Sequence, residues 1–153
     1  DPLNKKCVGV STLEAIAKPL ENTGVIAVAV MDARCNQVYT ATFDCLRGEL
    51  KRLTEDEAIT IDELTERLKT QDKQVVLIGD GANVCYNKMK DVLEGISIAS
   101  PTIRYQSASS VALIAEELIL KDENNAVSSD MLVPKYLRLS QAERELKKKQ
   151  ENN

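Results

Sequence analysis

The sequence predicts an α/β domain built around a mixed β-sheet. Residues 75–78 are four consecutive branched apolar residues, the pattern of a strand that helices cover on both faces. A Gly-Asp-Gly turn at residues 79–81 ends this strand, because glycine permits the positive φ angles of a tight turn. Asn83 is a good N-cap for a helix over residues 84–94. A strand, a glycine turn and a helix in succession are typical of α/β sheets.

Length and composition restrict the class of protein further. With 153 residues the chain is long enough for one domain with a core. A net charge of -4 argues against nucleic-acid binding through bulk positive charge. Tryptophan is absent, only one phenylalanine is present, and no apolar run approaches the roughly 20 residues of a membrane span. We therefore expect a cytoplasmic protein with no membrane contact.

Cysteine and histidine usage limits the chemistry. Cys7, Cys35, Cys45 and Cys85 show no C-x-x-C spacing and are predicted to be reduced structural thiols, with a set of disulfides as the alternative. The chain has no histidine, which removes His-dependent triads and His-ligated zinc sites. We predict no catalytic residue, no metal site and no cofactor.

The N-terminal part of the chain predicts a helix and a hairpin. Ser11 and Glu14 form a capping box, so a helix should start at residue 12 and end near Pro19. Residues 25–31 and 37–44 predict two strands joined by a polar turn. Before the helix, the chain is predicted to be a short strand or the end of a linker.

The middle of the chain predicts a third strand and another helix. Residues 47–53 are predicted to be an exposed antiparallel edge strand because they are highly charged. The acidic residues 54–58 are predicted to be a loop. Thr60 and Glu63 form a second capping box, and the helix that they start should end near Gln71.

The C-terminal part predicts one more strand and one more helix. A short extended segment at 102–104 is predicted as the last strand of the sheet. Residues 107–121 repeat apolar side chains at helical spacing. Residues 122–130 are predicted to be a polar loop and 132–138 an extended segment, since Pro134 restricts the residue before it.

The order of these elements predicts a particular kind of α/β sheet. Three antiparallel strands followed by alternating helices and parallel strands is the order of a ribonuclease H-like sheet, the unit duplicated in actin-like, two-lobed proteins. Residues 1–24 would be a linker and capped helix, and residues 25–139 the α/β lobe. Residues 140–153 would be a polar, charged tail with a frayed helix.

Five separated segments of the chain indicate the same family. In chain order they are residues 8–17, 32–34 with 38–41, 79–82, 98–101, and 134–138 leading to 141–143. Together they resemble the TsaB family, also called YeaZ, of the tRNA threonylcarbamoyladenosine pathway. Their order and spacing resemble the C-terminal lobe of the family over nearly the whole chain. The resemblance implies that the family's N-terminal lobe, which ends in a glycine-rich stretch, is absent from this sequence.

The resemblance also implies a function. TsaB-like proteins are non-catalytic partners of the enzyme TsaD, and the ATPase TsaE joins them while a threonylcarbamoyl group is transferred to the adenosine beside the tRNA anticodon. The expected role is therefore a scaffold with TsaD and TsaE as partners, a homodimer as a further association, and only indirect contact with tRNA. The superfamily's older label, glycoprotease, does not fit a chain without histidine.

The resemblance places one group of residues at a cleft between lobes. The cleft-facing candidates are Asp32, Arg34, Gly79, Asp80, Gly81 and Ala82. In the family this cleft is thought to be degenerate. The structural alternative is that Asp32 caps its turn, that Arg34 pairs with a nearby carboxylate, and that the glycine turn is a packing device.

Two other functions remain as alternatives. Asp32, Asp80 and Glu63 would be the carboxylates of a two-metal nuclease of ribonuclease H type. Such sites require a carboxylate in the buried middle of the first strand, where residues 26–30 are all apolar. The second alternative is a nucleotide-binding or self-associating actin-like module, in which the glycine turn holds the nucleotide.

Overall fold

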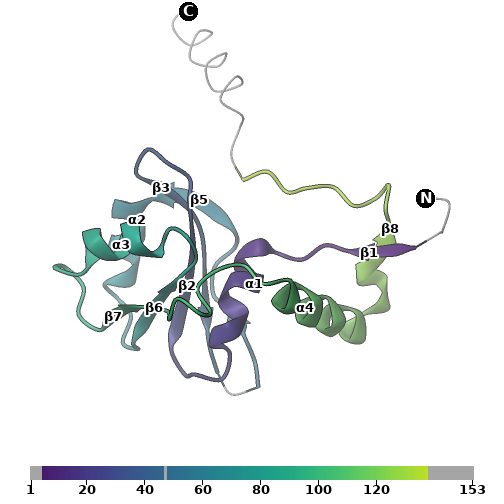
Figure 1. Ribbon diagram of the computed structural model, residues 1–153, viewed down its shortest axis with the longest axis horizontal. Coiled ribbons are helices and arrows are strands. Elements are labelled where there is room, and N and C mark those ends of the chain that lie inside the picture. The colour runs from purple at the N-terminus through teal and green to yellow at the C-terminus, as the bar shows by residue number, and fades with distance from the viewer. Residues whose placement is uncertain (1–4, 47, 138–153) are drawn as a thin grey trace, which may run out of the picture.

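The computed structural model describes residues 5–46 and 48–137, which form a mixed six-stranded sheet, a separate two-stranded sheet and covering helices (Figure 1). The strand order is β4-β3-β2-β6-β7, and β5 also pairs with β3. The elements are β1 (Lys6–Val8), α1 (Thr12–Ala17), the 3-10 helix η1 (Lys18–Leu20), β2 (Ile26–Asp32), β3 (Gln37–Asp44), β4 (Lys51–Arg52), β5 (Glu57–Thr60), α2 (Ile61–Leu68), β6 (Val75–Ile78), α3 (Ala82–Met89), β7 (Ile96–Ile98), α4 (Ala108–Lys121), the 3-10 helix η2 (Glu123–Asn125) and β8 (Ala126–Ser128). The predicted α/β class with a mixed sheet is confirmed.

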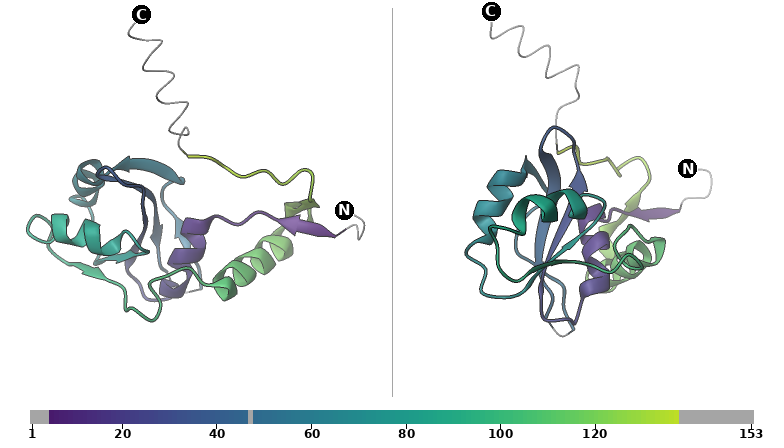
Figure 2. Two further views of the ribbon diagram at one scale, coloured as in Figure 1. Left: turned by 45° about the horizontal axis from the view of Figure 1, so that its top comes forward. Right: turned by 60° about the vertical axis from the view of Figure 1, so that its left-hand side comes forward.

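Strand β2 lies at the centre of the sheet. It pairs antiparallel with β3 over its whole length and parallel with β6 from Ile26↔Val75 to Ala29↔Ile78. Alternate residues of β2 face opposite sides, as the two-residue period of a strand requires. Val28 packs with helices α2 and α3, whereas Ala29 packs with α1 on the other face. Figure 2 shows α1 and the pair α2–α3 on opposite sides of the sheet.

Local capping determines where two helices begin. The Ser11 hydroxyl accepts a hydrogen bond from the Glu14 amide at 3.2 Å, and the Thr60 hydroxyl accepts one from the Glu63 amide at 3.1 Å. Both predicted helix starts are confirmed. Helix α2 ends at Leu68, slightly before the predicted end near Gln71.

The edge beside β3 differs from the prediction. Within the described residues 48–53 of the predicted edge strand 47–53, only Lys51–Arg52 forms a strand. Glu57–Thr60, within and just after the predicted loop 54–58, forms β5. Both short strands pair with β3, β4 at its C-terminal end and β5 at its N-terminal half. The charge pattern correctly indicated an exposed edge beside β3. It did not indicate that two short strands, β4 and β5, pair with different parts of β3 along that edge.

The segments after β6 also differ. Helix α3 starts at Ala82 with Gly81 as its N-cap and ends at Met89, so the predicted cap at Asn83 and the predicted end at residue 94 are wrong. The glycine turn leads directly into the helix, because the Ala82 amide already bonds to the Gly79 carbonyl at 3.2 Å. The predicted strand at 102–104 is wrong too, since the last strand of the sheet is β7, parallel to β6.

The small sheet β1–β8 joins segments from opposite ends of the described chain. Lys6 pairs with Ser128 and Val8 with Ala126 in an antiparallel ladder. The short strand near the N-terminus is confirmed, whereas the predicted loop 122–130 contains β8. No local pattern reveals a pairing between such distant segments. In Figure 1 this sheet lies beside α4, away from the main sheet.

Other sequence predictions have mixed outcomes. The predicted tail helix at 140–153 lies outside the described residues. The division at residue 24 stays a prediction, and α1 packs in one core with β2 and β3. The four cysteines are free thiols, with Cys45 and Cys85 buried. Within residues 5–46 and 48–137, no helix has the length and apolar character needed to cross a membrane.

Candidate functional site at the ends of β2 and β6

The two aspartates of the predicted cleft lie together. Asp32 ends β2 and Asp80 follows β6, and the ends of neighbouring parallel strands meet at one edge of a sheet. The Asp80 carboxylate accepts a hydrogen bond from the Asp32 amide at 3.1 Å. One residue after Asp80, the Gly81 amide donates to the Val30 carbonyl at 3.1 Å. These contacts tie the glycine turn to the end of β2.

Glycine is required in this turn because the backbone of β2 is very close. Gly79 has a φ of +115°, and a Cβ built on it would lie 2.1 Å from the Val30 carbonyl oxygen. A Cβ on Gly81 would lie 3.1 Å from the Asp32 nitrogen. Gly79, Gly81 and Ala82 are all buried. The geometry supports the interpretation of this turn as a packing device.

Asp32 also organises the hairpin between β2 and β3. Its Oδ1 accepts a hydrogen bond from the Arg34 amide at 2.7 Å, the side-chain turn that aspartate favours. Arg34, Cys35 and Asn36 have φ angles of 62°, 51° and 61°, three consecutive residues in the left-handed region. The expected capping role of Asp32 is therefore confirmed.

Contacts to two helices hold this unusual hairpin in place. The Asn36 carbonyl accepts from the Ile61 amide at 3.0 Å, and its side-chain amide donates to Asp62 at 3.1 Å, both at the start of α2. The Asn36 side-chain oxygen accepts from Lys88 of α3. The Arg34 guanidinium, in contrast, makes no ion pair within residues 5–46 and 48–137.

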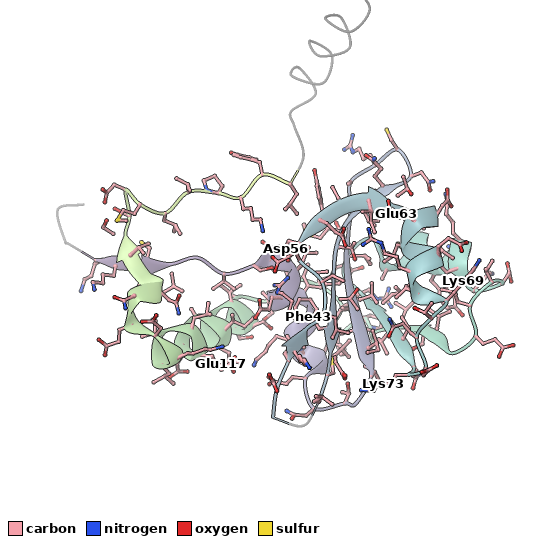
Figure 3. All side chains as sticks on the ribbon, turned by 180° about the vertical axis from the view of Figure 1, so that it is seen from behind. Phe43, Asp56, Glu63, Lys69, Lys73 and Glu117 are labelled. Carbon is pink, nitrogen blue, oxygen red and sulfur yellow. The ribbon has the colours of Figure 1, made fainter. Side chains whose placement is uncertain are left out.

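The carboxylates of the nuclease alternative do not form a metal site. Glu63 lies on α2 and pairs with Arg67 at 2.6 Å. Figure 3 shows Glu63 and Glu117 on opposite sides of the molecule. Among the described residues, no three Cys, Asp or Glu side chains are placed to hold a metal ion. Asp32, Asp80 and Glu63 therefore do not form the predicted trio.

Two grooves of the described part of the chain lie away from the six candidates. The larger, about 880 Å³, is lined by the start of α1, Met31, Tyr39 and residues 132–137. The second, about 440 Å³, lies between η1 and the start of α4. None of the six cleft candidates lines either groove. Their role at a cleft between lobes stays a prediction.

Sequence reasoning missed an ion-pair network beside the larger groove. Arg52 pairs with Glu14 and with Asp56, each at 2.7 Å, and lies 4.8 Å from the centre of the Phe43 ring. Ser11 donates to Asp56 at 2.7 Å. Figure 3 labels Asp56 and Phe43 of this network. Burial alone would lower the pKa of Arg52, but the hydrogen bonds with both carboxylates raise it. These partners come from three separate segments, so no local motif signals the network.

The mixed sheet, its helices and the glycine turn define an α/β lobe of the ribonuclease H-like class. A family model described as TsaD: tRNA N6-adenosine threonylcarbamoyltransferase matches residues 1–146. The chain belongs to this family.

Similar proteins make the assignment more specific. The chain is 28% identical over 134 residues to the tRNA threonylcarbamoyladenosine biosynthesis protein TsaB of Bacillus subtilis, a match that covers 88% of this chain and 56% of that protein. The solved structure of YeaZ from Pseudomonas aeruginosa superposes with a TM-score of 0.66 at 18% identity, covering 89% of this chain and 61% of that one. The predicted TsaB (YeaZ) resemblance is confirmed.

A second solved structure agrees on the fold. It is a Pseudomonas aeruginosa protein described as similar to peptidase YeaZ, with a TM-score of 0.65 at 18% identity, covering 84% of this chain and 57% of that one. The chain therefore spans little more than half the length of the relatives that it matches.

Proposed function

We propose that this chain is part of a non-catalytic scaffold in the biosynthesis of threonylcarbamoyladenosine in tRNA. The family match over residues 1–146 and the similarity to a TsaB protein support this role. The proposed partners are TsaD, which transfers the threonylcarbamoyl group, and TsaE. Contact with tRNA is indirect, through the complex, and the complex acts in the cytoplasm.

The non-catalytic part of the proposal rests on the hydrogen bonds that the Asp32 and Asp80 carboxylates make. A catalytic carboxylate must direct its oxygen atoms at a substrate. Here Oδ1 of Asp80 accepts a hydrogen bond from the Asp32 amide and Oδ1 of Asp32 accepts one from the Arg34 amide, so one oxygen of each carboxylate serves the local backbone. The absence of histidine also separates this chain from His-ligated zinc peptidases, although one solved relative is described as similar to a peptidase.

A reconstitution tests this proposal. The natural protein that contains this chain is mixed with TsaD, TsaE, tRNA and the enzyme that makes the threonylcarbamoyl donor. Threonine, bicarbonate and ATP are supplied as substrates. The modified nucleoside is measured by mass spectrometry. Omitting the protein should abolish modification. Asp32→Asn and Asp80→Asn should leave the rate within about 3-fold, because an amide oxygen still accepts a backbone hydrogen bond.

Two results would contradict the proposal. Full modification without the protein would show that it has no supporting role. A large loss of rate in Asp80→Asn, with the melting temperature unchanged, would assign catalysis to that carboxylate.

Self-association is a second proposal, supported by exposed apolar residues on α4. Leu113 is 50% exposed and Leu120 80% exposed, although apolar side chains favour burial. Sedimentation velocity tests it: a dimer that Leu120→Lys converts to a monomer supports the proposal, and a monomer at all concentrations overturns it.

A further inference from the structure

The second groove, about 440 Å³, has the features of a binding site. It lies where η1 and the turn after β7 meet the start of α4. Lys18, Glu21, Ile103 and Leu113 are among the side chains that line it, together with Ser107, Ser109 and Ser110 at the start of the helix. None of these residues belongs to the site at the ends of β2 and β6.

Helix α4 begins at this groove without a cap. The side chain of the N-cap residue Ser107 bonds to no helix amide, and its hydroxyl shares a 2.6 Å hydrogen bond with that of Ser109. The first amide of the helix with a backbone acceptor is that of Val111, which donates to the Ser107 carbonyl at 3.3 Å. The amides of residues 108–110 have no acceptor among residues 5–46 and 48–137. A helix of 14 residues therefore presents free donors and a partial positive charge here.

The hydroxyl of Ser110 is a second, independent indication of a ligand. Ser110 is 6% exposed and lines the groove. Within the described part of the chain, its side chain makes no hydrogen bond. Buried polar groups almost always have a partner, in the protein or in a bound molecule. A ligand that carries an acceptor would supply the missing partner.

The net charge of Lys18 and its two carboxylate partners limits the charge of a ligand in the groove. Its side chain is 7% exposed and its ammonium group pairs with Glu21 at 2.7 Å and with Glu117 at 2.6 Å. One cation between two carboxylates leaves one net negative charge, and the helix end offsets about half of it. The remaining negative charge repels a phosphate dianion about twice as strongly as a ligand with a single negative charge, so a single negative charge is the most that the groove favours.

The third proton of the Lys18 ammonium group is a further free donor, because its two ion pairs use only two of three. The apolar side chains of Ile103 and Leu113, which line the same groove, suit a hydrocarbon group.

We propose that this groove binds a small monocarboxylate with a branched apolar group. The carboxylate oxygens accept hydrogen bonds from the first amides of α4 and from the Ser110 hydroxyl. The apolar group contacts Ile103 and Leu113. The proposal uses none of the residues at the ends of β2 and β6, and its test is separate from the reconstitution of tRNA modification.

A titration with matched compounds tests the charge requirement. The probe is 4-methylpentanoate, added to the ¹⁵N-labelled 153-residue chain, with 4-methylpentanamide as its uncharged isostere and inorganic phosphate as a dianion. We expect saturable amide shifts at residues 108–110 with the acid, at millimolar concentration. The amide should bind about 10-fold more weakly, because hydrogen bonds to a charged acceptor are stronger. Equal binding of acid and amide, binding of phosphate alone, or no saturable shift overturns the proposal.

A serine substitution tests the position of the ligand. Ser110→Ala should weaken binding of 4-methylpentanoate about 5- to 10-fold. It should not lower the melting temperature of the free chain, since it removes a buried hydroxyl without a partner. Ser129→Ala, at an exposed position, is the matched control and should bind as the unaltered chain does. Unchanged affinity in Ser110→Ala overturns the proposal.

Discussion

The main sheet and helix α4 are both rich in apolar residues, yet they are packed very differently. Residues 27–30 of β2 are 0% exposed, with helices on both faces. Helix α4 is apolar around most of its circumference, but only Ser110 and Ile114 on it are buried. Apolar composition therefore does not by itself give burial, because burial also requires an element on each apolar face.

The contacts that hold the two regions differ in the same way. The sheet is stabilised by long ladders and two continuous apolar clusters. Helix α4 is attached mainly through Ile114 and the Lys18–Glu117 ion pair. Within the described residues, the ion pair of the segment after β8 is an exposed Lys135–Glu55 contact at 3.8 Å, which contributes little to stability. We expect α4 and this segment to open more readily than the sheet does.

The largest predicted effect is that of Gly79→Ala in the sheet. The new Cβ would collide with the Val30 carbonyl at 2.1 Å, in a backbone conformation that alanine rarely adopts. We expect a loss of about 4 kcal/mol in the free energy of unfolding. Urea denaturation measures it. Gly95→Ala is the control: its φ is also positive, at +71°, but no atom lies within 4 Å, so about 1 kcal/mol is expected. Equal losses would contradict the steric argument.

The next effect compares two leucines. Leu77 in β6 is 0% exposed and Leu120 on α4 is 80% exposed. Leu77→Ala should destabilise by about 3 kcal/mol through a cavity in the core, and Leu120→Ala by less than about 0.5 kcal/mol. Thermal unfolding of both variants measures the difference. A large loss for Leu120→Ala would mean that α4 is covered in solution, as in the proposed dimer.

A smaller effect concerns the attachment of α4. Lys18→Met should destabilise by about 1 kcal/mol and increase amide hydrogen exchange in α4 more than in β2. Lys69→Met, which breaks the exposed pair with Glu66, should change neither. Uniform exchange across both regions would contradict a separate opening of α4.

The ion pairs of Lys18 with Glu21 and Glu117 predict that stability depends on pH. Burial alone would lower the pKa of Lys18, but hydrogen bonds to Glu117 and Glu21 raise it above the ordinary 10.5. The folded state therefore holds this proton more tightly than the unfolded state does. The stabilisation is complete below pH 10.5 and is lost as pH rises above it through the folded pKa. Urea denaturation at a series of pH values above 10.5 should show this loss of stability, and Lys18→Met should lack it.

Thiol reactivity compares an exposed and a buried position within the main-sheet region, with the least effect on stability. Burial raises the pKa of the Cys85 thiol to about 12, with a further contribution from Asp32, whereas Cys35 is exposed on the hairpin. At about pH 8, a disulfide reagent should modify Cys35 within minutes and Cys85 only after unfolding. Cys35→Ser should remove the contribution of Cys35 to the fast phase and leave only that of the half-exposed Cys7. Rapid reaction of Cys85 in the folded chain would show that α3 separates readily from the main sheet.

The same contrast separates what could be predicted from the sequence and what could not. Strands β2, β3 and β6 and the starts of α1 and α2 follow from local apolar runs and caps. The proximity of Asp32 and Asp80 follows from two parallel strands. Strand β8 could not be predicted, because its partner β1 is at the other end of the described chain.

The predicted start of α3 and the predicted position of the last strand were wrong for a related reason. Gly81 serves as N-cap because the turn packs on β2, so the capping preference of Asn83 has no effect. The Arg52 network and the hydroxyl of Ser110 likewise depend on neighbours distant in sequence. Local patterns contain no information on such contacts.

The turn between β2 and β3, with its three left-handed residues, affects the expected folding kinetics. Strands β2 and β3 are adjacent in sequence, so their ladder closes only a short loop, which typically takes about 1–10 μs. The turn places three residues in the left-handed region. The hydrogen bonds that hold Asn36 there come from α2 and α3, which lie later in the chain than the hairpin. We therefore expect the turn to reach its final shape only when β6 docks in parallel on β2. This docking would be the slow step of folding, and the hairpin turn would report on it.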